Sequence, residues 1–389
     1  MSVQIDSKQA LIAAILFSIM GVFAMMIGPV MITSLIVDLG FDEGQASLIL
    51  AIEYLGIALA SICAAFWLNR VSWKAAGALA ASVIVVGNIV SGMQTSFEVL
   101  AVVRFLVGFL GEGVAFVIGI AVVSSTKDQQ RNFGFVIASQ VAFGVAANYI
   151  LPNFFIPTMQ FGGIMYPLAA LALVFAFAVI WLPSGAAAPG ADGDQAAAAG
   201  GGSVWPAVIA LIAMFVWCTG LGAIWNFVSQ IAIEGGLTRE SAGNAIAISS
   251  ACAILGGIIA SAIGARFGSF VPVAAAITVQ VIMIWFLQGD FSFWQFVATA
   301  AVFQIFWNIT GPFLMGAVSI LDPKGQISVM IPAAQIGGLF LGLAIAGSAI
   351  GPGDLSPANQ IAIACCILAL LIFAPIGLKM SKPAAEASA

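Results

Sequence analysis

Long apolar stretches separated by short gaps dominate this chain of 389 residues. A helix needs roughly 20 mostly apolar residues to cross the hydrocarbon core of a bilayer, and about twelve stretches in the sequence reach that length. A chain that is 62% hydrophobic and only 7% charged cannot present a polar surface to water. We therefore expect an all-α membrane protein with twelve transmembrane helices, embedded in a lipid bilayer.

The gaps between these stretches alternate in charge. Nine of the eleven Lys and Arg residues fall in every second gap or near the termini, whereas the opposite gaps hold only Arg239. The nine are Lys8, Arg70, Lys74, Lys127, Arg131, Arg266, Lys324, Lys379 and Lys382. Because cytoplasmic loops carry the excess of Lys and Arg, we expect both termini in the cytoplasm. The protein should be a multi-pass protein of the plasma membrane, which in a bacterium is the inner membrane.

Turn signals between the apolar stretches give approximate bounds for the helices. We expect spans near 10–37, 44–68, 74–93, 97–124, 133–156, 161–182, 204–233, 240–264, 268–288, 291–320, 326–350 and 357–378. A Pro, Gly and Ala tract follows the sixth span, and such a composition cannot bury a core. The sequence therefore predicts an N-terminal six-helix bundle (1–182), a flexible cytoplasmic linker (183–203) and a C-terminal six-helix bundle with a short cytoplasmic tail (204–389).

The two halves repeat one another at an offset of 196 residues. At this offset the segment from Gly40 to Glu43 aligns with the segment from Gly236 to Arg239, at the outer start of the second span of each half. The segment 69–72 aligns in the same way with 265–268, at the inner end of that span. Parallel six-helix repeats are an architecture of secondary transporters, in which the substrate site lies near the membrane midplane between the repeats.

Three motifs add a family resemblance. The loop after the second span reads AFWLNRVSWK over 65–74 and keeps Arg70 and Lys74 of the pattern G-x-x-x-D-R-x-G-R-[RK], with Asn69 in place of the acid. The fourth span begins the pattern R-x-x-x-G at Arg104, and a basic loop over 127–134 runs into a Gly. In these motifs and in its six-plus-six layout the chain resembles the major facilitator superfamily. The resemblance implies two pseudo-symmetric six-helix bundles, with helices 1, 4, 7 and 10 lining a central cavity.

Arg104 is the one basic residue placed inside an apolar stretch, where a charge is costly and marks a functional candidate. Counting about 1.5 Å per residue, Glu53 in the second span reaches a similar depth, so the two side chains can pair. Glu112 follows Arg104 on the same predicted helix face. We predict that Arg104 binds an anionic substrate and that Glu53 or Glu112 carries the coupled proton. The alternative is a static ion pair that braces the N-terminal bundle.

Amide side chains recur at helical spacing in the remaining spans. Amides facing lipid are unfavourable, so these positions mark inward faces. The residues that we predict to bind substrate, besides Arg104, are Gln140, Asn148, Asn226, Gln230, Gln304, Trp307, Asn308 and Gln335. The alternative is that the amides only join neighbouring helices. Trp307 lies within these polar stripes and is predicted to form an apolar wall for a ring-bearing solute.

Proline and loop residues are candidates for gating. Pro29 in the first span and the pair Gly311 and Pro312 in the tenth interrupt backbone hydrogen bonding and permit bending. The family resemblance adds Arg70 and Lys74 of the loop motif as gating residues.

The favoured function is a secondary active transporter that takes up a small organic anion, a carboxylate, together with protons by alternating access. The alternative is a proton-coupled exporter of amphipathic compounds or drugs, although the fifth span lacks the Gly-Pro pair of the family's antiporter signature at Gly144. An enzyme is disfavoured, since no nucleophile with a base and no metal cluster is visible and the chain has no His. We expect no cofactor, no metal, no nucleic-acid partner and a monomer.

Overall fold

The computed structural model describes residues 3–184, 204–263, 266, 268–322, 327–351 and 353–380. Within these ranges the chain is helical and has no β-strand. Eleven helical segments are long and apolar enough to cross a membrane, and Phe270–Phe286 adds a shorter apolar helix. This confirms the expected all-α membrane fold with twelve spans. Most of the predicted linker, 185–203, lies outside the described residues, as do Lys324 and Lys382.

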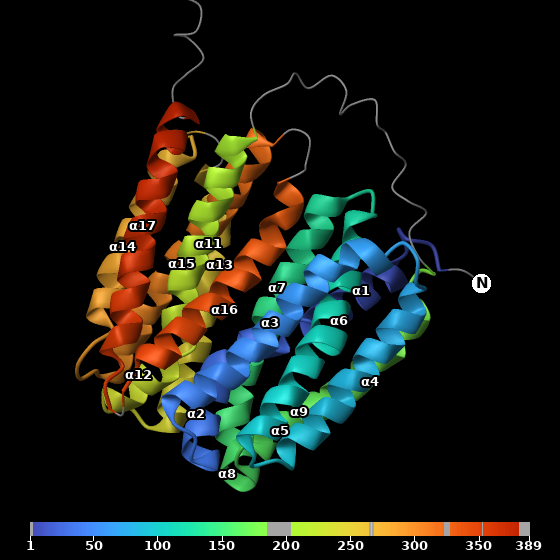
Figure 1. Ribbon diagram of the computed structural model, residues 1–389, viewed down its shortest axis with the longest axis horizontal. Helices are drawn as coiled ribbons and strands as arrows, with labels where there is room; N and C mark the ends of the chain where they lie inside the picture. The colour runs from blue at the N-terminus through green and yellow to red at the C-terminus, as the bar shows by residue number, and fades with distance from the viewer. Residues whose placement is uncertain are drawn as a thin grey trace, which may run out of the picture.

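The first six spans lie together on one side of the molecule, blue to green in Figure 1. Several of them are built from more than one helical piece. The elements are α1 Lys8–Met20 with α2 Phe23–Leu39, α3 Glu43–Trp67, α4 Trp73–Gly92, α5 Phe97–Leu106 with a π-helical turn Val107–Glu112 and α6 Gly113–Ser124, α7 Gln129–Ile150 with a π-helical turn Leu151–Phe155 and α8 Ile156–Met159, and α9 Gly162–Ala176 with a 3₁₀ turn Phe177–Trp181.

The second six spans occupy the other side, yellow-green to red in Figure 1. The elements are α11 Trp205–Trp225 with α12 Val228–Glu234, α13 Arg239–Ile263, α14 Phe270–Phe286, α15 Phe293–Leu321, a 3₁₀ turn Ser328–Met330 with α16 Ile331–Ala349, and α17 Ser356–Met380. Below, the terminal end means the end of the molecule where α1 begins and α17 ends, and the opposite end means the other. The charge pattern predicts that the terminal end is cytoplasmic.

Local chemistry fixes where several helices begin and end. Asp42 and Gln45 form a reciprocal capping box at the start of α3, in which the Gln45 N–H donates to the Asp42 carboxylate at 2.7 Å. Gly40, after α2, and Gly236, after α12, both have positive φ, +72° and +96°, which glycine adopts without steric strain. These two glycines stand at the 196-residue offset, so the two halves turn with the same backbone geometry at this point.

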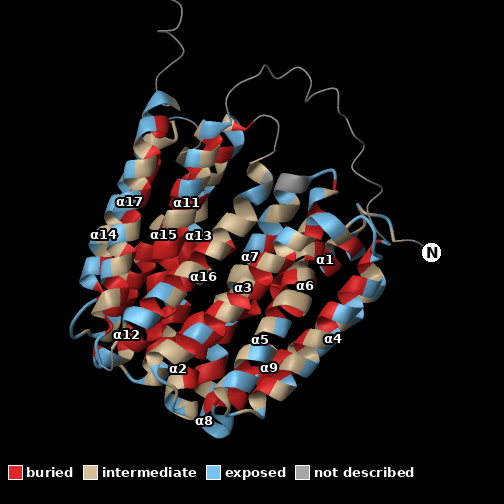
Figure 2. Ribbon diagram, viewed as in Figure 1, coloured by how far each residue is buried: buried red, intermediate tan, exposed pale blue. Residues whose placement is uncertain are grey.

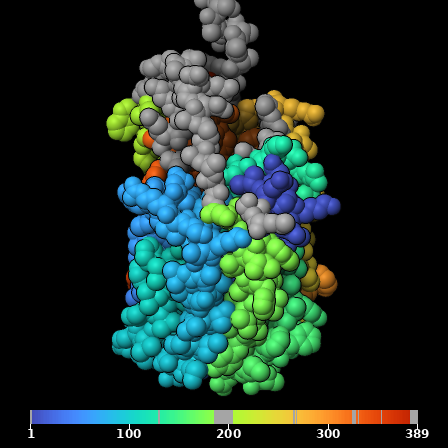
Figure 3. Space-filling view, turned by 90° about the vertical axis from the view of Figure 1, so that its right-hand side faces the viewer, coloured from blue at the N-terminus to red at the C-terminus, as the bar shows by residue number. Residues whose placement is uncertain are grey.

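Burial follows the expected pattern of a membrane bundle. Buried residues gather where helices face one another, and exposed residues lie on the outer faces (Figure 2). On the face of the first half, α4 and α9 pack side by side (Figure 3). Large apolar side chains of these two spans, such as Leu79, Val86 and Phe177, are exposed. An apolar outer surface of this kind suits contact with lipid rather than water.

The main contacts between the two halves join α3 with α16, α7 and the π-helical turn Leu151–Phe155 with α13, and α2 with α12. At the opposite end α3 and α16 approach closely. Gly347 of α16 permits this approach, since a Cβ at that position would overlap the side chain of Ser47 in α3. This interface positions the residues of the candidate site described next.

Candidate functional site

A central cavity of about 170 Å³ lies between the two halves. Its wall draws on α2, α3 and α7 of the first half and on α11, α13, α15 and α16 of the second. The lining residues are Met25, Met26, Tyr54, Val141, Gly144, Asn148, Trp225, Asn226, Ser250, Ala253, Gln304, Trp307, Asn308 and Leu339. Amides and hydroxyls supply its polar surface, aromatic and aliphatic side chains supply its apolar surface, and none of these lining side chains carries a formal charge.

Five of the residues predicted to bind substrate line this cavity: Asn148, Asn226, Gln304, Trp307 and Asn308. They come from three different spans, so the fold brings together residues far apart in the sequence. Asn148 Nδ2 donates to the carbonyl oxygens of Met26 at 2.9 Å and Gly144 at 2.8 Å. These bonds fix the side chain and leave Asn148 Oδ1 without a protein partner among the described residues, although it is buried. An unpaired buried acceptor beside a cavity is a ready contact for a solute.

The other predicted amides do not line the cavity. Gln140 Nε2 donates to the carbonyl oxygen of Ser18 at 3.2 Å, and Gln335 Nε2 contacts Met315 Sδ at 3.6 Å. Gln230 in α12 is buried, and its Nε2 atom has no partner within the described part of the chain. For Gln140 and Gln335 the geometry matches the alternative reading, in which an amide joins neighbouring helices.

An aromatic group forms one wall of the cavity. The rings of Trp225 and Trp307 meet edge to face with centroids 5.8 Å apart, and Phe303 packs against Trp307 at 5.9 Å. Such edge-to-face pairs hold the indoles at a fixed angle. This aromatic wall is apolar and comes from the second half, whereas Asn148 and Tyr54 line the cavity from the first half.

Tyr54 is a cavity residue that sequence reasoning missed. Its hydroxyl donates a hydrogen bond of 2.9 Å to Asn226 Oδ1, which joins α3 of the first half to the end of α11 in the second. Asn226 Nδ2 in turn donates to the carbonyl oxygen of Gly222 at 3.1 Å, which orients the amide. The available signal was position: Tyr54 follows Glu53 inside an apolar span, and a buried tyrosine hydroxyl needs a partner.

Arg104, Glu53 and Glu112 form a buried charged cluster inside the first half. Arg104 Nη2 pairs with Glu53 Oε1, and Arg104 Nε donates to Glu53 Oε2 at 2.9 Å. Arg104 Nη1 donates to Asn88 Oδ1 at 2.7 Å. All three charged side chains are at most 1% exposed. The predicted pairing of Glu53 and Arg104 is therefore present, but Arg104 does not line the central cavity.

Glu112 is less well paired than Glu53. Its Oε1 atom lies 3.8 Å from Arg104 Nη2 and has no hydrogen-bond partner among the described residues, and its Oε2 atom accepts from the Ala24 N–H at 3.4 Å. That N–H is available because α1 ends at Met20 and α2 begins anew at Phe23, so the first N–H groups of α2 have no acceptor in their own helix. Two carboxylates share one guanidinium, and burying an unbalanced charge is costly. The cluster is therefore suited to hold a proton.

The gating residues predicted from the sequence fall at different places. Pro29 lies within α2, where its carbonyl oxygen accepts from Thr33 Oγ1 at 3.0 Å. Gly311 and Pro312 lie within α15. At the terminal end Lys74 Nζ donates to the carbonyl oxygen of Ile180 at 3.2 Å, and Arg70 is exposed.

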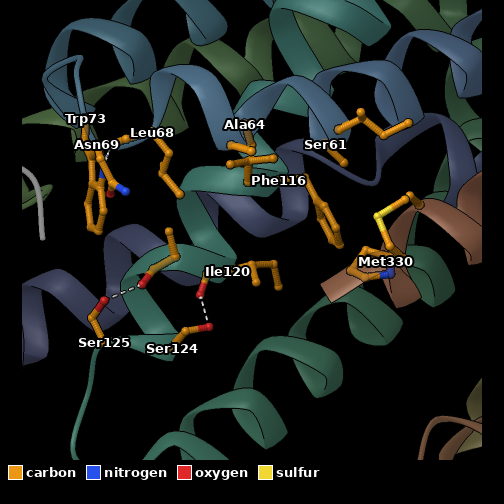
Figure 4. A pocket seen from close by; sticks show the side chains of 16 residues that line it. Ser61, Ala64, Leu68, Asn69, Trp73, Phe116, Ile120, Ser124, Ser125 and Met330 are labelled. Atoms are coloured by element: carbon orange, nitrogen blue, oxygen red, sulfur yellow. Dashed lines mark hydrogen bonds between the residues drawn. The ribbon is translucent and has the colours of Figure 1, made fainter. Parts of the chain in front are cut away.

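A second, apolar pocket of about 450 Å³ opens near the loop motif at the terminal end (Figure 4). We refer to it as the terminal-end pocket. One wall comes from α3 and α6 of the first half, including Ala64 and Phe116, and the other from the start of α16, including Met330 and Ala333. The hydroxyls of Ser124 and Ser125 are bonded back to their own helix, so they add little polarity (Figure 4).

Comparisons with known proteins agree with this architecture. A crystal structure of a mutant of the nucleoside transporter NupG superposes with a TM-score of 0.72 at 14% identity, over 96% of this chain and 100% of that one. A second NupG structure gives 0.68 at 14% identity, over 97% and 100%. A structure from work on substrate recognition in proton-dependent oligopeptide transporters gives 0.69 at 12% identity, over 96% and 99%.

The chain has the fold of the major facilitator superfamily. This agrees with the resemblance drawn from its motifs and confirms the twelve-helix, two-bundle architecture. At these identities the likeness shows the fold alone. Neither a scan against family profiles nor a search of curated proteins finds a match.

Proposed function

We propose that the protein is a secondary transporter that moves a small polar organic solute through the central cavity by alternating access, coupled to protons. The observation that carries this proposal is the cavity itself. It lies between two halves that contact one another mainly through paired helices, and its wall is shared by both. A site between two parallel six-helix repeats is where transporters of this architecture bind substrate. The structural neighbours include a nucleoside transporter and a proton-dependent oligopeptide transporter.

The cavity chemistry favours a solute without net charge. Its polar groups include the amides of Asn148, Asn226, Gln304 and Asn308, each of which can donate and accept hydrogen bonds. The indoles of Trp225 and Trp307, which stand perpendicular to one another, offer apolar surfaces against which a ring can pack. A ring that carries several hydroxyl or amide groups fits both features, and a nucleoside has this chemistry.

The organic anion predicted from the sequence is less well supported. That prediction rested on Arg104 as the contact for a carboxylate. In the folded chain the Arg104 guanidinium is already bonded to Glu53 and Asn88 and lies outside the cavity wall. A carboxylate solute would have to displace Glu53 to reach it, and would leave a buried carboxylate without its partner.

The cavity is small, and the two halves are in contact at the opposite end but separated by a pocket at the terminal end. A volume of about 170 Å³ is below the range of roughly 300–1,000 Å³ that is usual for ligand pockets. The halves are joined at the opposite end by an ion pair between Asp38 and Arg239, whereas the terminal-end pocket separates them at the other. The cavity should therefore widen toward the terminal end when a solute enters from that side.

Thermal unfolding of the purified protein tests the substrate class, because a ligand that binds the folded state raises its apparent stability. Uridine serves as the neutral ring-bearing probe and benzoate as the anion. We expect uridine to stabilise the protein and Asn308→Ala to weaken its affinity by about tenfold, the equivalent of one hydrogen bond. Gln288→Ala, an exposed amide at the opposite end, is the matched control. Stabilisation by benzoate with none by uridine would support the organic anion instead.

Uptake into proteoliposomes then tests the coupling. With an inwardly directed proton gradient, labelled uridine should accumulate above its outside concentration, and a protonophore should abolish the accumulation. Accumulation driven by a sodium gradient alone would contradict coupling to protons.

A further inference from the structure

Tyr54 stands between the central cavity and the charged cluster. Its hydroxyl donates to Asn226 Oδ1 at 2.9 Å and also lies 3.5 Å from the carbonyl oxygen of Ala24. The N–H of the same Ala24 residue donates to Glu112 Oε2 at 3.4 Å. One residue of α2 therefore contacts Tyr54 through its carbonyl group and Glu112 through its amide group.

We propose that Tyr54 is a positioning residue that transmits the separation of the two halves to Glu112 through the first turn of α2. The inference rests on the proposed proton-coupled transport. Tyr54 itself binds no proton in this scheme. It acts by holding or releasing the backbone of Ala24, and the proton resides on the Oε1 atom of Glu112, which has no hydrogen-bond partner among the described residues.

In the first step of the proposed transmission, the Tyr54 hydroxyl changes from one hydrogen-bond acceptor to another. A tyrosine hydroxyl has one hydrogen to donate, and the acceptor at 2.9 Å takes it in preference to the one at 3.5 Å. Asn226 belongs to the second half and Ala24 to the first. When the halves part at the opposite end, Asn226 moves away with α11. The Tyr54 hydroxyl then loses its nearer acceptor, and the carbonyl oxygen of Ala24 is the remaining protein acceptor within its reach among the described residues.

The second step is a change at the start of α2. Both contacts of Ala24 are long in the present state, at 3.4 and 3.5 Å, and hydrogen bonds weaken over a few tenths of an ångström in this range. A firm bond from Tyr54 to the Ala24 carbonyl therefore repositions its N–H against Glu112. A carboxylate that gains or loses a backbone donor in a buried site changes its preference for the proton.

The groups that face Glu112 are few. Arg104 on α5 and Glu53 on α3 interact with it electrostatically, as does Tyr54, and no other charged or titratable side chain acts on it among the described residues. The α2 and α4 elements beside the cluster contribute the Ala24 N–H and the Asn88 amide. When the halves part at the opposite end, the effect therefore reaches Glu112 through the contact with Ala24, whose carbonyl group faces Tyr54.

Gly28 lies against the hydrogen bond between Tyr54 and Asn226 and leaves no room for a larger residue. A Cβ at Gly28 in α2 would meet Tyr54 Oη at 3.0 Å and would overlap Oδ1 of Asn226. A side chain at this position therefore separates the two groups that bond across the halves. Gly28→Ala breaks the same hydrogen bond as Tyr54→Phe, from the opposite side.

The test follows the opening of the opposite end as pH is changed, and it needs no solute. Spin labels on Thr95 and Gln288, exposed residues in loops of the first and second half, report the distance between the halves in full-length protein in nanodiscs. The five native cysteines are replaced beforehand. We expect the wild-type distance distribution to change between about pH 5 and about pH 8, the range that spans a carboxyl with a perturbed proton affinity.

Tyr54→Phe and Asn226→Ala should each reduce this pH response by at least about twofold, as expected when one hydrogen bond carries the link. The double variant should lose no more than either single one, because both remove the same bond. Tyr166→Phe is the matched control, since its hydroxyl also donates to a backbone carbonyl, that of Gly92 at 3.0 Å, but on the exposed face. If Tyr54→Phe does not fold, Gly28→Ala replaces it.

A Tyr54→Phe response equal to that of Tyr166→Phe would overturn the inference. So would additive losses in the double variant, because two independent effects do not share one bond. A wild-type protein without any pH response would instead contradict the proton coupling of the proposed function, and the role of Tyr54 with it.

Discussion

Asp38 at the end of α2 and Arg239 at the start of α13 form a two-point ion pair that joins the halves at the opposite end. Arg239 Nη1 and Nη2 donate to the two carboxylate oxygens of Asp38 at 2.7 and 2.9 Å, and Nη2 also contacts Ser34 Oγ. The Asp38 side chain is 6% exposed and that of Arg239 is 24% exposed. A bidentate pair with this geometry fixes orientation as well as distance.

Removing this pair should favour opening at the opposite end. Arg239→Ala leaves Asp38 without its partner, and a partly exposed pair of this kind contributes about 1 kcal/mol after solvent screening. The population of the opened state should therefore rise about fivefold. Distances between labels on Thr95 and Gln288 measure this population. Arg266→Ala removes a basic residue at the terminal end and is the control; equal opening in both variants would show that charge alone matters.

Glu112→Gln should separate exchange from accumulation. The amide imitates a protonated carboxyl, so the cluster keeps one carboxylate for one guanidinium whatever the pH. Labelled uridine should still exchange across the membrane at a rate within about twofold of wild type, but a proton gradient should no longer drive it uphill. Glu98→Gln alters an exposed carboxyl at the start of the same span and should leave both properties intact. Undiminished accumulation in Glu112→Gln would remove Glu112 from the coupling step.

Arg104 should contribute more to stability than to solute affinity. Arg104→Ala leaves Glu53 and Glu112 buried without a cation, and breaking a buried pair from one side costs about 3–5 kcal/mol. The double variant Arg104→Ala with Glu53→Gln should recover much of this loss, because it leaves one buried carboxyl fewer without a cation. Thermal unfolding gives the stabilities and a uridine titration the affinities. A variant Arg104→Ala with wild-type stability and no affinity for any probe would restore Arg104 as a substrate contact.

Filling the terminal-end pocket should hold the halves apart at that end. Ala333 at the start of α16 faces the α3 and α6 wall across this pocket. When the terminal end closes, these walls must approach, and the indole of Ala333→Trp would stand between them. We expect uridine exchange to fall by at least about tenfold, since closure is needed for each cycle. Ala75→Trp places the same bulk beside a pocket walled by the first half alone. It should transport normally, and equal loss in both would indicate general damage.

Hydropathy and charge were enough to predict the spans, because lipid exposure demands long, continuous stretches of apolar residues. The breaks within the spans were not predictable from these signals. The π-helical turn Val107–Glu112 shifts the register between Arg104 and Glu112, and the break before α2 makes the Ala24 N–H available. Both depend on tertiary contacts that hold the irregular turn, which a single helical period does not encode.

The candidate site was predicted in part. Amide spacing identified Asn148, Asn226, Gln304 and Asn308, since polar side chains avoid lipid. The same rule also selected Gln140, which faces a neighbouring helix. A polar inward face can meet either a cavity or another helix, and sequence spacing alone does not separate the two. Tyr54 was not predicted, because a tyrosine ring is common in an apolar span. Its proposed role depends on one hydrogen bond from its hydroxyl to the other half.

Distances at both ends of the same molecule report whether the two halves alternately expose one cavity. Labels on Thr95 and Gln288 at the opposite end, and on Ser72 and Ser269 at the terminal end, report the two distances. None of these four positions has a positive φ, so a label there adds no backbone strain. As pH or bound uridine shifts the equilibrium, we expect one distance to lengthen while the other shortens. Distances that change in the same direction, or that stay fixed under conditions in which the protein transports, would contradict it.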